Sequence, residues 1–163
     1  MSHFERAMGW LPDYPDFRDY TDRTASVNDL LRPKRLRREA GEGKALKQQV
    51  IPPKVDLREW CSPVEDQRNL GSCTAHAGVG LIEYYERKCF GRHIDASRLF
   101  LYKVTRNLMK VKGDTGAYLR TTMGAMVLFG VPPESYWPYT DDPNKFDLEP
   151  PAFCYAFAQN FQA

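Results

Sequence analysis

Apolar residues recur at helical spacing in the stretch that follows Ser72. They stand three, four or seven positions apart, which places them on one side of a helix. This apolar face consists of Ala75, Val79, Ile82 and Cys89. Ser72 is of a residue type that caps helix N-termini, and Gly91 is of the type that ends them. The pattern therefore predicts a helix between these two residues.

Three further stretches complete the pattern of elements. Residues 97–109 predict a second helix, and residues 118–129 predict a third, ended by Gly130. Residues 152–162 are apolar and aromatic and fit either a strand or a helix. We therefore expect a predominantly helical domain with little strand.

Gly78 and Gly80 lie inside the first predicted helix. Glycine is a poor helix former, so its presence there needs a reason. We expect both glycines to mark close packing against another element.

The first 50 residues differ from the rest of the chain. The stretch GWLPDYPDFRDYT alternates proline, aspartate and aromatic residues, which favours extended or turn conformations over helix. Residues 25–33 suit one or two helical turns, and a basic run follows at residues 31–44. We therefore divide the chain into residues 1–50, an N-terminal extension or pro-segment with a basic linker, and a globular domain at residues 51–163.

Charge and composition narrow the classes of partner. With 23 basic and 21 acidic residues, the net charge is only +2, which gives no global case for a nucleic-acid or membrane partner. The basic run fits a solvated linker, with a contact to nucleic acid or an anionic surface as the alternative. No apolar stretch near the N-terminus suggests a signal peptide, so we expect a cytoplasmic protein or secretion by a signal-independent route.

The four cysteines do not form a metal-binding pattern. No Cys-x-x-Cys pair occurs, so neither a zinc ribbon nor any cofactor is indicated. Free thiols in a reducing compartment are the first reading, and two disulfides are the alternative. We expect Cys61, Cys89 and Cys154 to be small buried apolar residues.

Cys73 is different because of its position at the start of the predicted helix. The unpaired N–H groups and the positive end of the helix dipole favour an anion, so a thiol there is more readily a thiolate. The backbone N–H of Cys73 and the side-chain amide of Gln67 can provide two donors aimed at one point. That is the arrangement that stabilises the oxyanion of a tetrahedral intermediate in acyl transfer.

Two linked blocks carry a resemblance to a known family. VDLREWCSPVEDQRNLGSCTAHA and GDTGAYLRTTMGAMVLFGVPPESYWPY resemble the papain-like cysteine peptidases of the C1 family, in their bacterial-type branch. The resemblance implies an α+β papain-like fold, of which residues 51–163 are mainly the helical (left) domain, with the β-rich half absent. It implies a hydrolase, a thiol protease of endopeptidase type, with Cys73 as nucleophile and Gln67 as oxyanion-hole amide.

The second block also matches the segment with which the family binds substrate. Thr115, Gly116 and Ala117 match the turn that pairs with the substrate backbone. Tyr118 and Leu119 match the side chains that flank the pocket for the second residue before the scissile bond.

The chain departs from the family pattern at three positions. The local signature has a cysteine three residues before the nucleophile and an aromatic residue after it, and here these places hold Leu70 and Thr74. The resemblance implies a disulfide from the first place to the glycine-rich turn, where this chain has Asp114. The missing bridge favours a reducing location, and the missing aromatic residue leaves the catalytic pair less shielded from water.

The sequence contains no evident candidate for the histidine that accepts the thiol proton in a cysteine peptidase. The family's His and Asn follow the nucleophile by about 130 to 150 residues, whereas the sequence ends at Ala163 and contains His3, His76 and His93. His76 is one turn after Cys73, and we assign it a structural role. We therefore expect this chain alone to lack peptidase activity and to depend on a β-rich domain, or on a second chain, for His and Asn.

Several alternatives stay open. The N-terminal extension either crosses the cleft as a blocker or packs as an arm on the back of the domain. The expected partners are a peptide or protein substrate and, through an exposed apolar face, a second copy of the chain. The main alternative function is a catalytically inactive papain-like binding or inhibitory module, and another is a different acyl transferase with a cysteine nucleophile.

Overall fold

The computed structural model describes residues 8–21, 23–27 and 53–161 of the chain. These residues fall into two compact units, Tyr14–Asp56 and a larger unit that joins Met1–Asp13 to Leu57–Ala163. In the smaller unit residues 25–27 are helical. The basic run at residues 31–44 and the rest of the helix expected at residues 25–33 lie outside the described residues. The functional argument concerns the larger unit.

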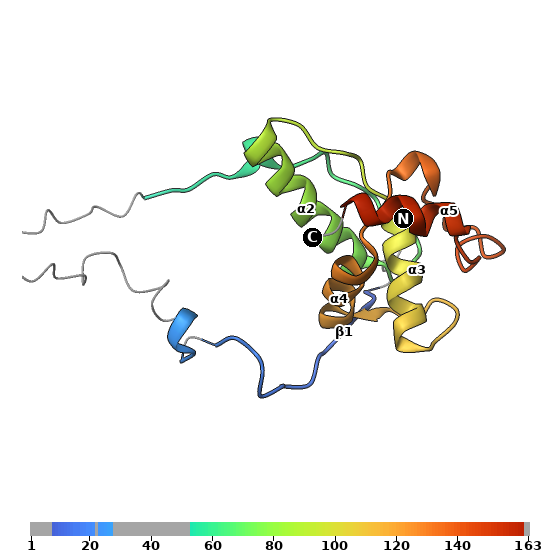
Figure 1. Ribbon diagram of the computed structural model, residues 1–163, viewed down its shortest axis with the longest axis horizontal. Coiled ribbons are helices and arrows are strands. Elements are labelled where there is room, and N and C mark those ends of the chain that lie inside the picture. Colours follow the sequence, from blue (N-terminus) through green and yellow to red (C-terminus); the bar gives the residue numbers. More distant parts are fainter. Residues whose placement is uncertain (1–7, 22, 28–52, 162–163) are drawn as a thin grey trace, which may run out of the picture. The chain divides into compact units, whose positions relative to one another are not determined.

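Three helices form the body of the larger unit (Figure 1): α2, Cys73–Phe90; α3, Arg98–Met109; and α4, Leu119–Phe129. Gly91 follows α2 with a φ of 71°, and Gly130 follows α4 with a φ of 72°. Both values lie in the left-handed region that glycine adopts without strain. The three helices and both terminating glycines are as the sequence predicted.

The shorter elements surround this body. Residues 152–162, which the sequence left ambiguous, begin as helix α5. The elements are α5 (Ala152–Ala158), the 3₁₀-helices η2 (Arg58–Trp60), η3 (Glu134–Tyr136) and η4 (Gln159–Phe161), and the two-residue strands β1 (Trp10–Leu11) and β2 (Ala117–Tyr118). β1 and β2 pair in parallel, with Trp10 opposite Ala117 and Leu11 opposite Tyr118. In the described residues the fold is thus mainly helical with little strand, as expected.

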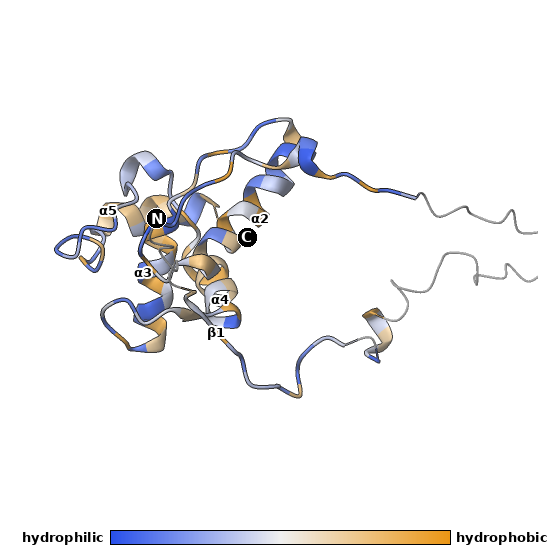
Figure 2. Ribbon diagram, turned by 180° about the vertical axis from the view of Figure 1, so that it is seen from behind, coloured by the Kyte–Doolittle hydropathy of each residue, from blue (hydrophilic) through white to orange (hydrophobic). Residues whose placement is uncertain are grey.

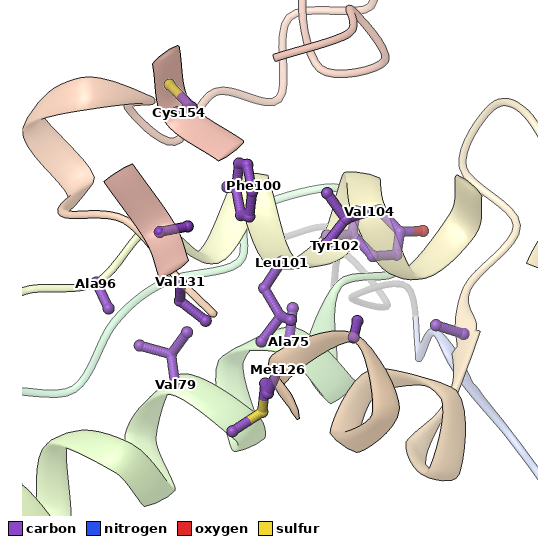
Figure 3. Packing of buried hydrophobic residues seen from close by; sticks show 13 residues of the cluster. Ala75, Val79, Ala96, Phe100, Leu101, Tyr102, Val104, Met126, Val131 and Cys154 are labelled. Atoms are coloured by element: carbon purple, nitrogen blue, oxygen red, sulfur yellow. The ribbon is translucent and has the colours of Figure 1, made fainter. Parts of the chain in front are cut away.

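The core forms around α3 (Figure 3). Phe100 points toward α5, where Cys154 lies, and Leu101 points the other way, toward Ala75 of α2 and Met126 of α4. Phe100, Leu101 and Ala75 are completely buried. The hydropathy colouring shows apolar residues concentrated along the packed helices (Figure 2). Burial of these side chains, rather than helix propensity alone, is what stabilises helices of this length.

The two glycines within α2 have different surroundings. A Cβ on Gly78 would lie 2.9 Å from the sulfur of Met126 and 3.2 Å from a methyl group of Leu101. Gly78 therefore allows α2 to approach α3 and α4 closely, as predicted. The same expectation for Gly80 was wrong, because a Cβ there would meet nothing within 4 Å.

A buried ion pair links α2 to the start of α3. Glu83 is completely buried, and both of its carboxylate oxygens accept hydrogen bonds of 3.1 Å from the guanidinium of Arg98. Arg98 also bonds Asp95 at 3.0 Å. Because a lone buried charge is costly, each partner here depends on the other.

Two of the expected buried cysteines are exposed. Cys154 is buried in α5 as predicted, but Cys61 and Cys89 are exposed. Cys61 follows η2 in a loop, and Cys89 lies in the last turn of α2, beyond Glu83, the last buried residue of that helix. All four thiols are free.

Candidate active site

Cys73 is the first residue of α2, which continues for 18 residues. It is half-buried, and the two residues before it, Gly71 and Ser72, are buried. The side chain thus stands at the positive end of a long helix dipole, with access to solvent. Thr74 occupies the next position and is buried, with its hydroxyl unpaired among the described residues.

Gln67 lies in the loop that leads into α2 and is also half-buried. The side-chain amide of Gln67 donates to the backbone carbonyl oxygen of Leu70 at 3.0 Å. The backbone carbonyl oxygen of Gln67 in turn accepts from the N–H of Leu70 at 3.3 Å. Residues 67–70 therefore form a tight turn, in which Arg68 has a left-handed φ of 51°. The guanidinium of Arg68 bonds Asp141 at 3.2 Å, which ties the turn to a distant segment.

A network of side chains joins the two ends of this loop. The hydroxyl of Tyr139 donates to the carbonyl oxygen of Gln67 at 2.7 Å and lies 2.7 Å from the hydroxyl oxygen of Ser72. Ser72 is the N-cap residue of α2, as predicted. Its hydroxyl makes no cap hydrogen bond and turns to Tyr139 instead. At α3, by contrast, the hydroxyl of Ser97 does cap the helix and accepts from the N–H of Phe100.

His76 belongs to the same network. Its Nδ1 lies 3.1 Å from the carbonyl oxygen of Ser72, which can only accept, so Nδ1 carries the hydrogen. The imidazole ring packs edge-on against Tyr139, with 5.1 Å between ring centroids. Burial lowers the pKa of His76, so the neutral ring is favoured. These contacts fit a structural role.

The turn at residues 113–117 lies against the loop that precedes Cys73. The carboxylate of Asp114 accepts from the N–H of Gly71 at 2.9 Å and from the hydroxyl of Tyr102 at 2.6 Å. The same hydroxyl accepts from the N–H of Gly116 at 3.0 Å. Asp114 thus occupies the place where the resemblance implies a disulfide, and it provides hydrogen bonds there. The sequence showed the missing cysteine, but it gave no signal for Tyr102.

The candidate substrate-binding residues have mixed exposure. Gly116 and Ala117 are buried, Tyr118 is half-buried, and Thr115 and Leu119 are exposed. Gly116 has a φ of 72°, a conformation that favours glycine. Thr115, Leu119 and strand β2 therefore lie on one short segment that bends at Gly116.

The N-terminal arm, residues 8–13, meets this segment. The N–H of Ala117 donates to the carbonyl oxygen of Gly9 at 2.7 Å, the first contact of the β1–β2 pair. Gly9 fits between two other glycines: a Cβ on Gly9 would lie 1.6 Å from the carbonyl oxygen of Gly71, and a Cβ on Gly116 would lie 2.3 Å from the carbonyl oxygen of Gly9. The arm thus pairs with the segment that the resemblance assigns to substrate binding.

A hollow in the described part of the chain lies away from the candidate site. It has a volume of about 360 Å³ and lies between α2 and α4, lined by Leu81, Ile82, Tyr85, Met123, Met126 and Val127. None of the candidate site residues lines it, so the chemistry around Cys73 and not the size of the hollow identifies the site. No group of His, Cys, Asp or Glu suited to a metal ion occurs in residues 8–21, 23–27 and 53–161. Within the same ranges, no helix is both long and apolar enough to span a membrane.

Known proteins are similar to this chain in sequence and fold. No family model matches the chain. It is 32% identical, over 172 aligned positions, to an uncharacterized peptidase C1-like protein of Acanthamoeba polyphaga mimivirus, and the match covers 97% of this chain. The structure of xylellain, a cysteine protease from Xylella fastidiosa, matches with a TM-score of 0.68 and 29% identity over 99% of this chain. A chain from a study of the mite allergens Blo t 1 and Der p 1 matches at 22% identity and a TM-score of 0.50 over 58% of this chain, which bears on the fold alone.

The fold is therefore that of the helical half of a papain-like α+β protein. In sequence and fold the chain is similar to papain-like C1 peptidases, as its two sequence blocks indicated. It spans half the length of the curated relative and 59% of the xylellain chain.

Proposed function

We propose that the protein of which these 163 residues form the helical half hydrolyses peptide bonds through Cys73. After the thiol proton has passed to a base, the sulfur attacks the carbonyl carbon and the carbonyl electron pair moves to oxygen. The base then protonates the amine, which leaves as the intermediate collapses to a thioester, and water hydrolyses the thioester to restore the thiol. Gln67 and the backbone N–H of Cys73 stabilise the oxyanion. The observation that carries this proposal is the partly buried cysteine at the first position of a long helix, in a chain related to cysteine peptidases.

The proton acceptor comes, in this proposal, from outside these residues. The Nδ1–H of His76 is engaged by Ser72, and the histidine ring packs on Tyr139. A histidine from a β-rich domain or a second chain would then approach Cys73, with an Asn to orient it. The 163 residues alone are expected to bind and react with electrophiles but not to turn over peptides.

The N-terminal arm is proposed to compete with substrate. Its Gly9 carbonyl holds the N–H of Ala117, and its strand β1 runs along Tyr118. A peptide that pairs with β2 must displace these contacts. The arm would thus lower the affinity for substrate until it is displaced or removed.

The exposed cysteines provide an internal control for the test. Cys61 and Cys89 are more accessible than the half-buried Cys73. If Cys73 is activated, limiting iodoacetamide near pH 6 labels it faster than either of these thiols, as measured by peptide mass spectrometry. Equal or slower labelling of Cys73 would contradict the proposal, because accessibility alone favours the other two.

A catalytically inactive binding module is the second candidate. It is favoured by the hydrogen bond from the amide of Gln67 to Leu70, which directs one N–H of this amide away from the oxyanion role. In that case a bound peptide would remain intact. Cleavage of a fluorogenic peptide by the longer protein, abolished by Cys73→Ala and retained in Cys89→Ala, would exclude this candidate.

A further inference from the structure

Tyr139 ends the WPY motif and lies 72 positions after Gln67 in the sequence. In the sequence, this motif is the end of the second block that resembles the papain-like peptidases, and the sequence gave no role for the side chain of Tyr139. In the structure its hydroxyl reaches both ends of the loop that carries the two candidate catalytic residues.

We infer that Tyr139 is a positioning residue that fixes Gln67 relative to Cys73. This inference rests on the proposed function. It adds the side chain that keeps the two oxyanion donors, the amide of Gln67 and the backbone N–H of Cys73, in a fixed position relative to each other. The distances support it: the Tyr139 hydroxyl is 2.7 Å from the carbonyl oxygen of Gln67 and 2.7 Å from the hydroxyl oxygen of Ser72, the residue directly before Cys73.

The hydrogen-bond directions follow from the groups involved. The backbone carbonyl oxygen of Gln67 can only accept, so the Tyr139 hydroxyl donates to it. The Ser72 hydroxyl then donates to Tyr139. Burial raises the pKa of Tyr139 to about 12, so the phenol keeps its proton at neutral pH. The link between the two loop ends is therefore present throughout the working range of a thiol enzyme.

The surroundings of Tyr139 make it a rigid support. Its backbone N–H donates to the carboxylate of Glu134, and its ring packs against His76. Two residues further on, Asp141 accepts from Arg68 at 3.2 Å and from Asn69 at 3.1 Å. Residues 139–141 thus hold the loop at both of its ends and along its middle.

The test uses an electrophile that needs the oxyanion donors. A small N-acyl amino aldehyde adds to Cys73: the S–C bond forms, the carbonyl electron pair moves to oxygen, and the thiol proton ends on that oxygen. Formation of this hemithioacetal in the 163-residue chain is followed by NMR with a ¹³C-labelled aldehyde. Iodoacetamide alkylation of the same thiol serves as the comparison, because that displacement forms no tetrahedral carbon whose oxygen faces the oxyanion donors.

Tyr139→Phe keeps the ring and removes the hydroxyl. We expect adduct affinity to fall by about threefold to tenfold, the effect of one hydrogen bond, while the alkylation rate stays within about twofold. Combined with Gln67→Ala, the effect of Tyr139→Phe should disappear, because the tyrosine acts through Gln67. Ser72→Ala, which leaves the bond from Tyr139 to Gln67 in place, should have the smaller effect.

Tyr155→Phe is the matched control. The Tyr155 hydroxyl bonds Glu149 and its ring packs on Phe100, so this change removes a comparable hydroxyl at another place. It should leave adduct affinity unchanged, and thermal unfolding followed by circular dichroism checks both variants. An equal loss with and without Gln67, or no loss at all, overturns the inference alone. If wild-type Cys73 forms no adduct, the proposed function fails, and the inference fails with it.

Discussion

Gly9→Ala should detach the N-terminal arm from the body of the protein. The added Cβ would lie 1.6 Å from the carbonyl oxygen of Gly71 and 2.1 Å from its carbonyl carbon. Ordinary contact between such atoms needs about 3.5 Å, and both of these Gly71 atoms belong to the backbone of a buried residue. The overlap is therefore too large to be relieved by small shifts, and the arm must move away.

The magnitude follows from the contacts that the arm would lose. These are the hydrogen bond of 2.7 Å from Ala117 to Gly9 and the two-residue pairing of β1 with β2. At about 0.5–1.5 kcal/mol for each hydrogen bond, a ladder of this length contributes about 1–3 kcal/mol. Because each 1.4 kcal/mol corresponds to about a tenfold change, hydrogen exchange at the Ala117 amide should accelerate by about fivefold to 150-fold.

The assay is hydrogen exchange at single-residue resolution by NMR. Gly80→Ala is the matched control, since a Cβ there meets nothing within 4 Å, and it should leave the Ala117 amide protected. Unchanged exchange at Ala117 in the Gly9→Ala protein would refute the account of the arm, because the overlap would then have been absorbed without loss of the pairing.

Three further changes test the packing and charges of the helical body. Gly78→Ala should destabilise the fold by about 1–3 kcal/mol through overpacking, whereas Gly80→Ala should stabilise it by about 0.5–1 kcal/mol; urea unfolding compares the two, and equal effects would contradict the packing of α2. Glu83→Ala should cost about 3–5 kcal/mol because it leaves Arg98 buried without its main partner, and a loss below 1 kcal/mol in the same measurement would show that the pair is dispensable. His76 has a lowered pKa in the folded state, so the unfolded chain binds the proton more readily and this group makes stability fall as the pH drops below about 6.5. His76→Phe should flatten that part of a plot of unfolding free energy against pH, and an unchanged slope would assign the effect to other groups.

Local signals in the sequence were enough to locate the helices. Gly91 and Gly130 end α2 and α4 as predicted, because this effect depends only on neighbouring residues. Gly78 and Gly80 show the limit of this reasoning. The two residues are alike in the sequence, and only the position of Met126 on another helix distinguishes them.

The candidate site could be predicted only in part. The position of Cys73 at a helix start and its spacing from Gln67 are local features. The contacts that organise the loop are not, because Tyr139 reaches Gln67 across 72 positions and Asp114 reaches Gly71 across 43. Hydrogen bonds between residues so far apart leave no periodic pattern in a single sequence, and the pairing of Gly9 with Ala117 is hidden for the same reason.

The bonds that Asp114 makes to Gly71 and Tyr102 have a practical consequence for redox chemistry. Where a cysteine bridge braces such a turn, a reducing agent that protects the nucleophile also threatens the brace. Here the brace contains no sulfur, so dithiothreitol can keep Cys73 reduced without loosening the loop beside it. Oxidative inactivation and its reversal should therefore be confined to thiol chemistry, and the scaffold should remain intact through repeated cycles.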